Sequence, residues 1–149
     1  MINVIYEDNH LLVVEKPVNV LSQGDDTNDK DMVNLLKNYL KVKYNKPGNV
    51  FVGLVHRLDR PVGGIMVFAK TSKAASRLSE QVRNKSFKKT YRAVLNGNMK
   101  KDKDTLKDYL YKNKKTNMVS VVNKNHKDAK DAELSYETIS KNEKFSMVQ

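Results

Sequence analysis

The chain has 149 residues, no cysteine, and 28 lysines and arginines against 17 acidic residues, which gives a formal net charge of +11. This length suits a single domain with its own core, and the lack of cysteine excludes disulfides and zinc-thiolate centres. No histidine spacing indicates a metal site, no run reaches membrane-spanning length and no signal peptide is recognisable, so we expect a cytoplasmic protein. The positive charge favours a polyanion such as nucleic acid, although an AT-rich genome also produces lysine bias.

In chain order, the first predicted elements are two strands joined by a polar turn, followed by a helix. The strands cover residues 4–6 and 11–17. Apolar residues at helical spacing within 33–40 predict the helix, for which Asp31 or Asp29 can serve as the N-cap.

A buried strand or extended segment, residues 50–55, then leads into the sequence His56-Arg57-Leu58-Asp59-Arg60-Pro61-Val62-Gly63-Gly64. Residues 65–69 return as a strand. A second helix begins near Thr71, with one apolar and one basic face. The basic face is either solvated or in contact with phosphates.

The rest of the chain is predicted to consist mainly of strands. These are expected at 88–97, 118–122 and 132–138, with a last one beginning at 144. Residues 100–115 hold seven lysines and three aspartates and are predicted as an exposed loop or hairpin arm, either solvated or touching RNA. This order gives an α+β fold with mainly antiparallel pairing, and no low-complexity linker divides the chain.

The segment 56–64 places one carboxylate, Asp59, between Arg57 and Arg60. We expect Asp59 to be ionised at neutral pH, because a guanidinium within about 4–6 Å favours the charged form of a carboxyl group. Taken alone, the segment also fits a turn in which the aspartate caps its own backbone.

Four ordered segments of the chain match the motifs of one known family. Residues 5–17 are similar to an opening "YED…VV.KP" hairpin, 56–60 to a signature segment, 64–71 to the strand that follows it, and 89–97 to a second motif. Together they resemble the RluA-type pseudouridine synthases, which isomerise uridine in ribosomal or transfer RNA. The resemblance implies this family's catalytic fold, a mainly antiparallel mixed sheet flanked by helices, over residues 1–149.

By this resemblance Asp59 is the catalytic aspartate, acting as a nucleophile at the sugar or as a base at C2′. Arg57 matches the arginine that enters the RNA helix where the target nucleotide is flipped out. Its alternative role is an ion pair with Asp59 or another carboxylate. Tyr91 matches the tyrosine that stacks on the uracil ring, whereas its alternating position alone would make it a core residue.

The remaining site residues predicted from the resemblance are His56, Arg60 and Lys89. We expect His56 to orient the loop by hydrogen bonding rather than to act as a base. Arg60 and Lys89 complete the substrate-binding set, with Lys89 supplying positive charge to a phosphate or to the site. RNA is then the partner, with no cofactor and no metal, and the full-length protein is expected to be a monomer.

The chain departs from the family pattern in two places. Residues 61–64 replace a polar "DTSG", and the "TGR.HQIR" motif that follows a strand like 145–148 in the family is absent. We therefore expect residues 1–149 to be the N-terminal portion of a catalytic domain, without a separate N-terminal RNA-binding domain, and inactive or weakly active alone.

Two other functions were weighed against this one. The first is an RNA-binding module of the same family that has lost the reaction, which would have no need for an ionised Asp59 under a stacking Tyr91. The second is a glycosidase that pairs Asp59 with Glu15 or Glu80, which requires two carboxylates at one site. The sequence gives no reason for these carboxylates to come together.

Overall fold

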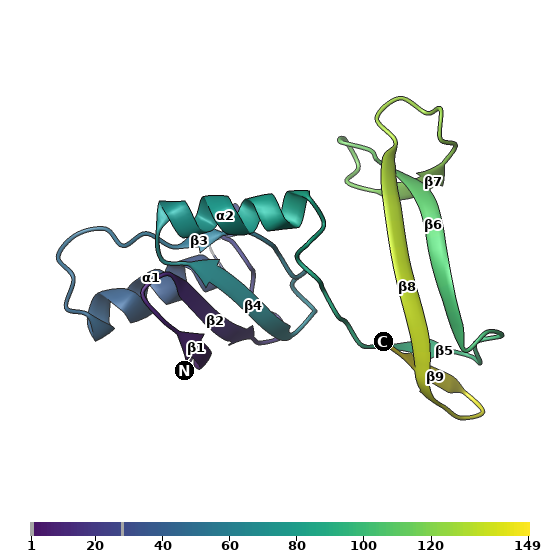
Figure 1. The fold of residues 1–149 in the computed structure, drawn as a ribbon, viewed down its shortest axis with the longest axis horizontal. Coiled ribbons are helices and arrows are strands. Elements are labelled where there is room, and N and C mark those ends of the chain that lie inside the picture. The colour runs from purple at the N-terminus through teal and green to yellow at the C-terminus, as the bar shows by residue number, and fades with distance from the viewer. Residues whose placement is uncertain (1, 28) are drawn as a thin grey trace. The chain divides into compact units, whose positions relative to one another are not determined.

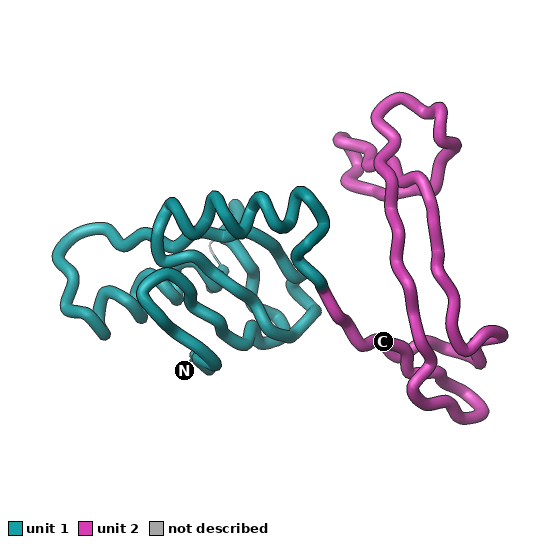
Figure 2. The backbone as a smooth tube through the Cα atoms, viewed as in Figure 1, with its two compact units in different colours: residues 1–88 teal, residues 89–149 magenta. Residues whose placement is uncertain are grey.

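The computed structural model describes residues 2–27 and 29–149 of the chain. The chain forms two compact units, residues 1–88 and residues 89–149, shown in different colours in Figure 2. Each unit has its own antiparallel sheet, so the predicted α+β class with mainly antiparallel pairing is confirmed. None of the described residues forms a helix long and apolar enough to cross a membrane.

The first unit is a four-stranded sheet with two helices (Figure 1). In spatial order its strands are β1 (Asn3–Glu7), β2 (Leu11–Lys16), β4 (Gly64–Ala69) and β3 (Gly53–Leu54), and its helices are α1 (Met32–Lys43) and α2 (Ser72–Arg83). Every neighbouring pair of strands is antiparallel. The segment expected as a strand over 50–55 therefore pairs only at residues 53 and 54.

The core of this unit lies between α1 and one face of β2 and β4. Alternate residues of the two strands meet on this face, with Leu12 opposite Phe68 and Val14 opposite Met66. The buried cluster comprises Leu12, Val14, Met32, Leu36, Leu40, Val50, Val52, Leu58, Met66 and Phe68. Because Leu58 belongs to it, the core reaches into the segment that carries Asp59.

Both helices begin at the residues that the sequence indicates. Asp31 caps α1 by accepting a hydrogen bond from the Asn34 backbone N–H at 3.1 Å, and Thr71 caps α2 through the N–H of Ala74 at 3.2 Å. At Gly53 an added Cβ would lie 2.9 Å from the Ala75 side chain, so a glycine is needed for α2 to approach β3 this closely.

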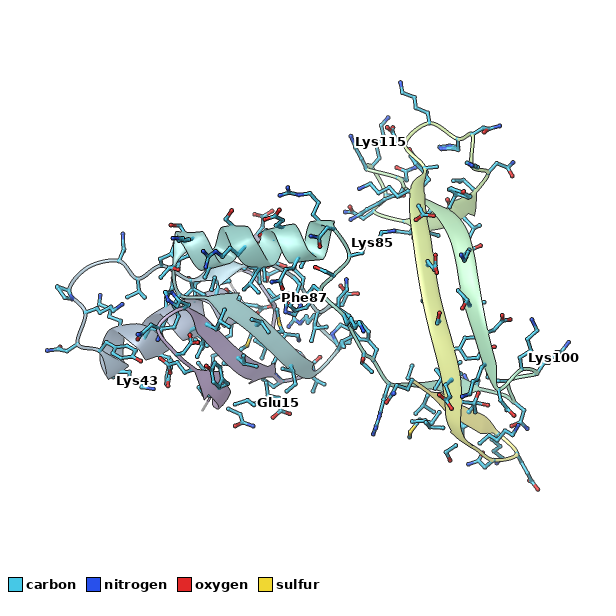
Figure 3. All side chains as sticks on the ribbon, viewed as in Figure 1. Glu15, Lys43, Lys85, Phe87, Lys100 and Lys115 are labelled. Atoms are coloured by element: carbon cyan, nitrogen blue, oxygen red, sulfur yellow. The ribbon has the colours of Figure 1, made fainter. Side chains whose placement is uncertain are left out.

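The second unit is a five-stranded antiparallel sheet without a helix. Its spatial order is β5 (Ala93–Asn96), β9 (Phe145–Val148), β8 (Lys130–Lys141), β6 (Lys103–Lys112) and β7 (Val119–Val122). The long strands β6 and β8 form an arm with β7. Figure 3 shows Lys100 near its base and Lys115 at its far end.

The arm has two chemically different faces. One face carries the cross-strand polar pairs Lys103–Glu137, Thr105–Ser135 and Lys107–Glu133. On the other face Leu106 lies opposite Leu134, and these side chains are 45% and 56% exposed. Within residues 89–149, all of which are described, Ser146 alone is buried.

Two expectations for this unit need correction. Most of residues 100–115 form strand β6, so the hairpin arm is right and the loop is wrong. The strand expected over 88–97 begins only at Ala93, because its partner β9 offers four residues and the ladder ends where Ala93 meets Val148.

Candidate active site

The site loop, residues 56–63, joins β3 to β4. Because β2 and β4 are paired, with Lys16 opposite Gly64, the loop that follows β2 runs beside the site loop at the same end of the sheet. Gly64 begins β4 at φ +148°, a backbone conformation that L side chains rarely adopt. The predicted turn glycine is therefore required by the backbone.

Ser22 holds the residue before Asp59 in place. Its hydroxyl donates to the Leu58 carbonyl at 2.6 Å and accepts from the Leu58 N–H at 3.1 Å. Ser22 is only 5% exposed and the Leu58 side chain belongs to the core. A single buried hydroxyl thus satisfies both backbone polar groups of Leu58.

Lys16 holds the residue after Asp59. Its Nζ donates to the carbonyls of Arg60 at 3.3 Å, Val20 at 2.7 Å and Pro17 at 3.0 Å, and the side chain is fully buried. Burial lowers the pKa of Lys16 from its usual value, while the negative charge of Asp59 acts in the opposite direction. The ammonium group therefore joins the two loops and places a positive charge in the field of Asp59.

The Asp59 side chain itself is exposed to solvent. Its backbone carbonyl accepts from the Val62 N–H at 3.0 Å and closes a turn. Among residues 2–27 and 29–149 the carboxylate has no hydrogen-bonding or ion-pairing side chain. The carboxylate is thus free to meet a substrate while the backbone on both sides of it is fixed.

The two flanking arginines point to other partners. Arg57 donates to the Gln23 side-chain oxygen at 2.8 Å, and Arg60 pairs with Asp29 at 2.8 Å. The two arginines that flank Asp59 in the sequence thus bind a carboxamide and a carboxylate of the neighbouring loop instead of the Asp59 side chain. The alternative role of Arg57 as an ion pair is wrong in the described part of the chain.

His56 makes the kind of hydrogen bond expected of it. Its Nε2 accepts from the Val67 backbone N–H at 3.0 Å, and its ring packs against Phe87 with the centroids 5.5 Å apart. His56 therefore ties the beginning of the site loop to β4.

Comparison with known proteins assigns the chain to one family. The family model for RNA pseudouridylate synthase matches residues 10–149, nearly the whole chain. The chain belongs to the RNA pseudouridylate synthase family. The resemblance to RluA-type enzymes is thereby confirmed.

Named relatives agree with this family. Ribosomal large subunit pseudouridine synthase C of Buchnera aphidicola is 32% identical over 115 residues, which cover 74% of this chain and 35% of the relative. The enzyme of the same name from Vibrio parahaemolyticus is 30% identical over 98% of this chain and 43% of its own length. The chain spans less than half the length of these relatives.

Solved structures confirm the fold. Human RNA Pseudouridylate Synthase Domain Containing 4 superimposes with a TM-score of 0.81 at 19% identity, covering 98% of this chain and 57% of that one. Human RNA Pseudouridylate Synthase Domain Containing 1 gives a TM-score of 0.73 at 16% identity, covering 99% and 58%. The α+β architecture is thus that of pseudouridylate synthase domains.

The predicted family residues fall into two groups. His56, Arg57, Asp59 and Arg60 share the site loop of the first unit, whereas Lys89 and Tyr91 precede β5 in the second. Tyr91 is 50% exposed and outside any strand, so the core position suggested by alternation alone is wrong. An exposed ring is available for stacking.

Sequence reasoning assigned no role to Lys16 and Ser22. Lys16 had a readable signal, since it continues the alternation of Leu12 and Val14 and so must face inward from β2. Ser22 lies in a loop without periodicity, and only the folded chain shows that its hydroxyl meets Leu58. No cluster of three or more metal-ligating side chains occurs among the residues that the structure describes.

Proposed function

We propose that the protein isomerises specific uridines in ribosomal or transfer RNA to pseudouridine, with Asp59 as the reacting carboxylate. Membership of the RNA pseudouridylate synthase family supports the reaction class. RNA as the partner is supported by the net charge of +11, which favours association with a polyanion. We place the reaction in the cytoplasm and propose that the full-length enzyme is a monomer.

The anchoring of Asp59 on both sides carries this proposal. The buried Ser22 hydroxyl fixes Leu58 and the buried Lys16 ammonium fixes the Arg60 carbonyl, yet the carboxylate between them is exposed. A reacting group held in place before the substrate arrives loses little conformational freedom when it reacts. A simple turn former would not need two buried polar side chains to hold its neighbours.

The reaction breaks the bond between N1 of uracil and C1′, rotates the base and joins C5 to C1′. No atom is gained or lost overall, because the proton that leaves C5 is balanced by one that N1 acquires. An ionised Asp59 either attacks C1′ or removes a proton from C2′, and both routes need the carboxylate charge.

Other residues are assigned to substrate binding. We propose that Arg57 enters the space vacated by the flipped nucleotide and that Tyr91 stacks on the uracil ring, worth about 1–3 kcal/mol. Arg60 and Lys89 contribute positive charge toward RNA phosphates. His56 positions the site loop through its hydrogen bond to β4.

The proposal is tested by release of tritium from C5-labelled uridine in RNA by the full-length protein. Asp59→Asn is expected to reduce the rate by at least about 100-fold, because an amide is neither base nor nucleophile here. Asp26→Asn, another exposed loop aspartate of the first unit, is the matched control and should retain the rate. Unchanged release by Asp59→Asn would refute the catalytic assignment.

We further propose that residues 1–149 are the N-terminal portion of a catalytic domain. A chain extended after Gln149 with a relative's "TGR.HQIR" segment should turn over faster and unfold at a higher temperature than the 149-residue chain. Equal activity of the two would contradict this division.

A further inference from the structure

A groove of about 690 Å³ runs along the exposed face of α1. Residues 29–31 and 48–50 line it together with residues of the helix. We call it the α1 groove, and its exposed polar lining consists of Asp29 together with Lys30, Asn34, Lys37, Asn38, Lys41 and Asn49. Three lysines and three carboxamides thus share one concave surface.

The carboxylates of the α1 groove are already engaged by other groups. Asp31 is 3% exposed and accepts from both the backbone and the side-chain nitrogen of Asn34. Asp29 forms the ion pair with Arg60. Within residues 2–27 and 29–149, Lys30, Lys37 and Lys41 have no ion-pair partner. The hydrogen bonds to Asp31 come from neutral groups, so its charge offsets one of these lysines and the groove keeps an excess of positive charge.

Other lysines near α1 are used differently. Lys43 donates to Glu7 at 2.7 Å, and Lys70 donates to the same carboxylate at 2.8 Å. These two cations stabilise the fold by joining α1 to β1 and the end of β4. Lys37 and Lys41 are four residues apart on the groove face, about 6 Å along the helix axis. Within the described residues neither of them forms an ion pair that joins two elements.

One ion pair links the α1 groove to the site loop. Asp29 lines the groove and its carboxylate binds the guanidinium of Arg60, the residue next to Asp59. An RNA strand that has its target uridine at Asp59 and runs past Arg60 would therefore approach the groove. The exchangeable Arg60–Asp29 pair, with both side chains about half exposed, lies at this junction.

We propose that the α1 groove binds the ribose-phosphate backbone of the RNA strand that flanks the target uridine. Lysine ammonium groups neutralise phosphates. The carboxamides of Asn38 and Asn49 can donate to phosphate oxygens and can both donate to and accept from 2′-hydroxyls. The proposal rests on the proposed function, since it assumes that Asp59 faces RNA. It assigns substrate binding to a helix face that none of the family motifs covers.

The test compares two matched pairs of charge removals. Lys37→Gln with Lys41→Gln removes two charges four residues apart on α1, and Lys73→Gln with Arg77→Gln does the same on the exposed face of α2. Glutamine has a helix propensity similar to that of lysine and arginine, so both helices should persist. Binding of a fluorescein-labelled oligouridylate to the full-length protein is measured by polarisation as a function of salt.

The α1 pair is expected to weaken binding and to lower the slope of log K against log salt by about 1.4, from about 0.7 per phosphate contact on a single strand. The α2 pair should leave the slope nearly unchanged. Equal losses from both pairs would show an effect of bulk charge only, and an unchanged slope for the α1 pair would show no contact; either result overturns the proposal.

Asp59→Asn separates this proposal from the proposed function. It should abolish tritium release and keep the wild-type salt slope. If Asp59→Asn still releases tritium while the α1 pair loses binding, the catalytic assignment fails and the groove assignment stands. If Asp59→Asn is inactive and the α1 pair binds normally, the groove assignment fails and the catalytic assignment stands.

Discussion

The two units of this chain are stabilised in different ways. Residues 1–88 enclose a cluster of buried apolar side chains between α1 and the sheet, whereas residues 89–149, all of them described, bury only Ser146 and expose leucines on one face of the arm. The first unit therefore gains stability from apolar burial, and the second depends mainly on its strand ladders and cross-strand pairs.

This difference has a functional side. Buried polar groups can position a loop only where a core surrounds them, and Ser22 and Lys16 satisfy that condition beside Asp59. Lys89 and Tyr91 have no such surroundings, since both are exposed. The backbone beside Asp59, the residue that we propose as the reacting carboxylate, is thus held in place in advance. The residues that we propose for the uracil ring and for positive charge lie on a weakly buried segment.

Separating the units should give the largest effect. Residues 1–88 expressed alone are expected to unfold in one cooperative transition, because their core is contained within them. Residues 89–149 alone should show no cooperative transition, since a sheet without a buried face is marginal in water. Circular dichroism with heating measures the unfolding of each piece. Cooperative unfolding of both would show that the two units do not differ in how they are stabilised.

The next largest difference is expected between matched leucine truncations, one in the core of the first unit and one on the arm of the second. Leu36→Ala removes a fully buried side chain of α1 and is expected to cost about 2–5 kcal/mol of unfolding free energy. Leu134→Ala, at 56% exposure on the arm, should change it by less than about 0.5 kcal/mol. Urea unfolding of the 149-residue chain measures both, and comparable costs would mean that the arm's apolar face is covered in solution.

Removing a hydroxyl tests the anchoring of the site loop. Ser22→Ala leaves the buried N–H and carbonyl of Leu58 without their shared partner, and we expect a loss of about 1–3 kcal/mol together with lower turnover. Ser135→Ala, which removes an exposed hydroxyl paired with Thr105, is the control and should cost less than about 0.5 kcal/mol. A Ser22→Ala protein with full stability and full activity would contradict the anchoring role.

The acid dependence of stability gives the smallest expected difference. Burial by itself would raise the pKa of Glu7, but hydrogen bonds from Lys43, Lys70, Tyr44 and Tyr39 outweigh it and hold the pKa at about 2, below the usual 4.5. A carboxylate with a depressed folded-state pKa stabilises the fold above its unfolded pKa and loses that effect as the pH falls.

The free energy of unfolding of the wild type should therefore exceed that of Glu7→Gln by about 1–2 kcal/mol above pH 4.5. This difference should vanish toward pH 2. Chemical unfolding across this range measures it. Glu137→Gln, which breaks an exposed pair with Lys103, should show almost no pH-dependent difference. A pH-independent gap for Glu7→Gln would show that the carboxylate charge is not the cause.

Local patterns were sufficient for most of the secondary structure. Asp31, one of two N-cap candidates for α1, the start of α2 near Thr71 and the strands of the first hairpin follow from side-chain chemistry and periodicity. The extent of β5 did not, because a strand is only as long as the partner it pairs with. Residues 88–92 have the side-chain alternation of a strand, but the pairing with β9 begins only at Ala93.

For the site, the sequence by itself determined the family, through its motifs, and predicted Asp59 as the reacting residue within one of them. Only the tertiary structure decided what surrounds that carboxylate. It placed Gln23 and Asp29 against the two arginines, and the buried Lys16 and Ser22 against the backbone beside Asp59. These contacts join residues more than thirty positions apart, and the pairing of β2 with β4 that creates them is a property of the whole sheet rather than of any local segment.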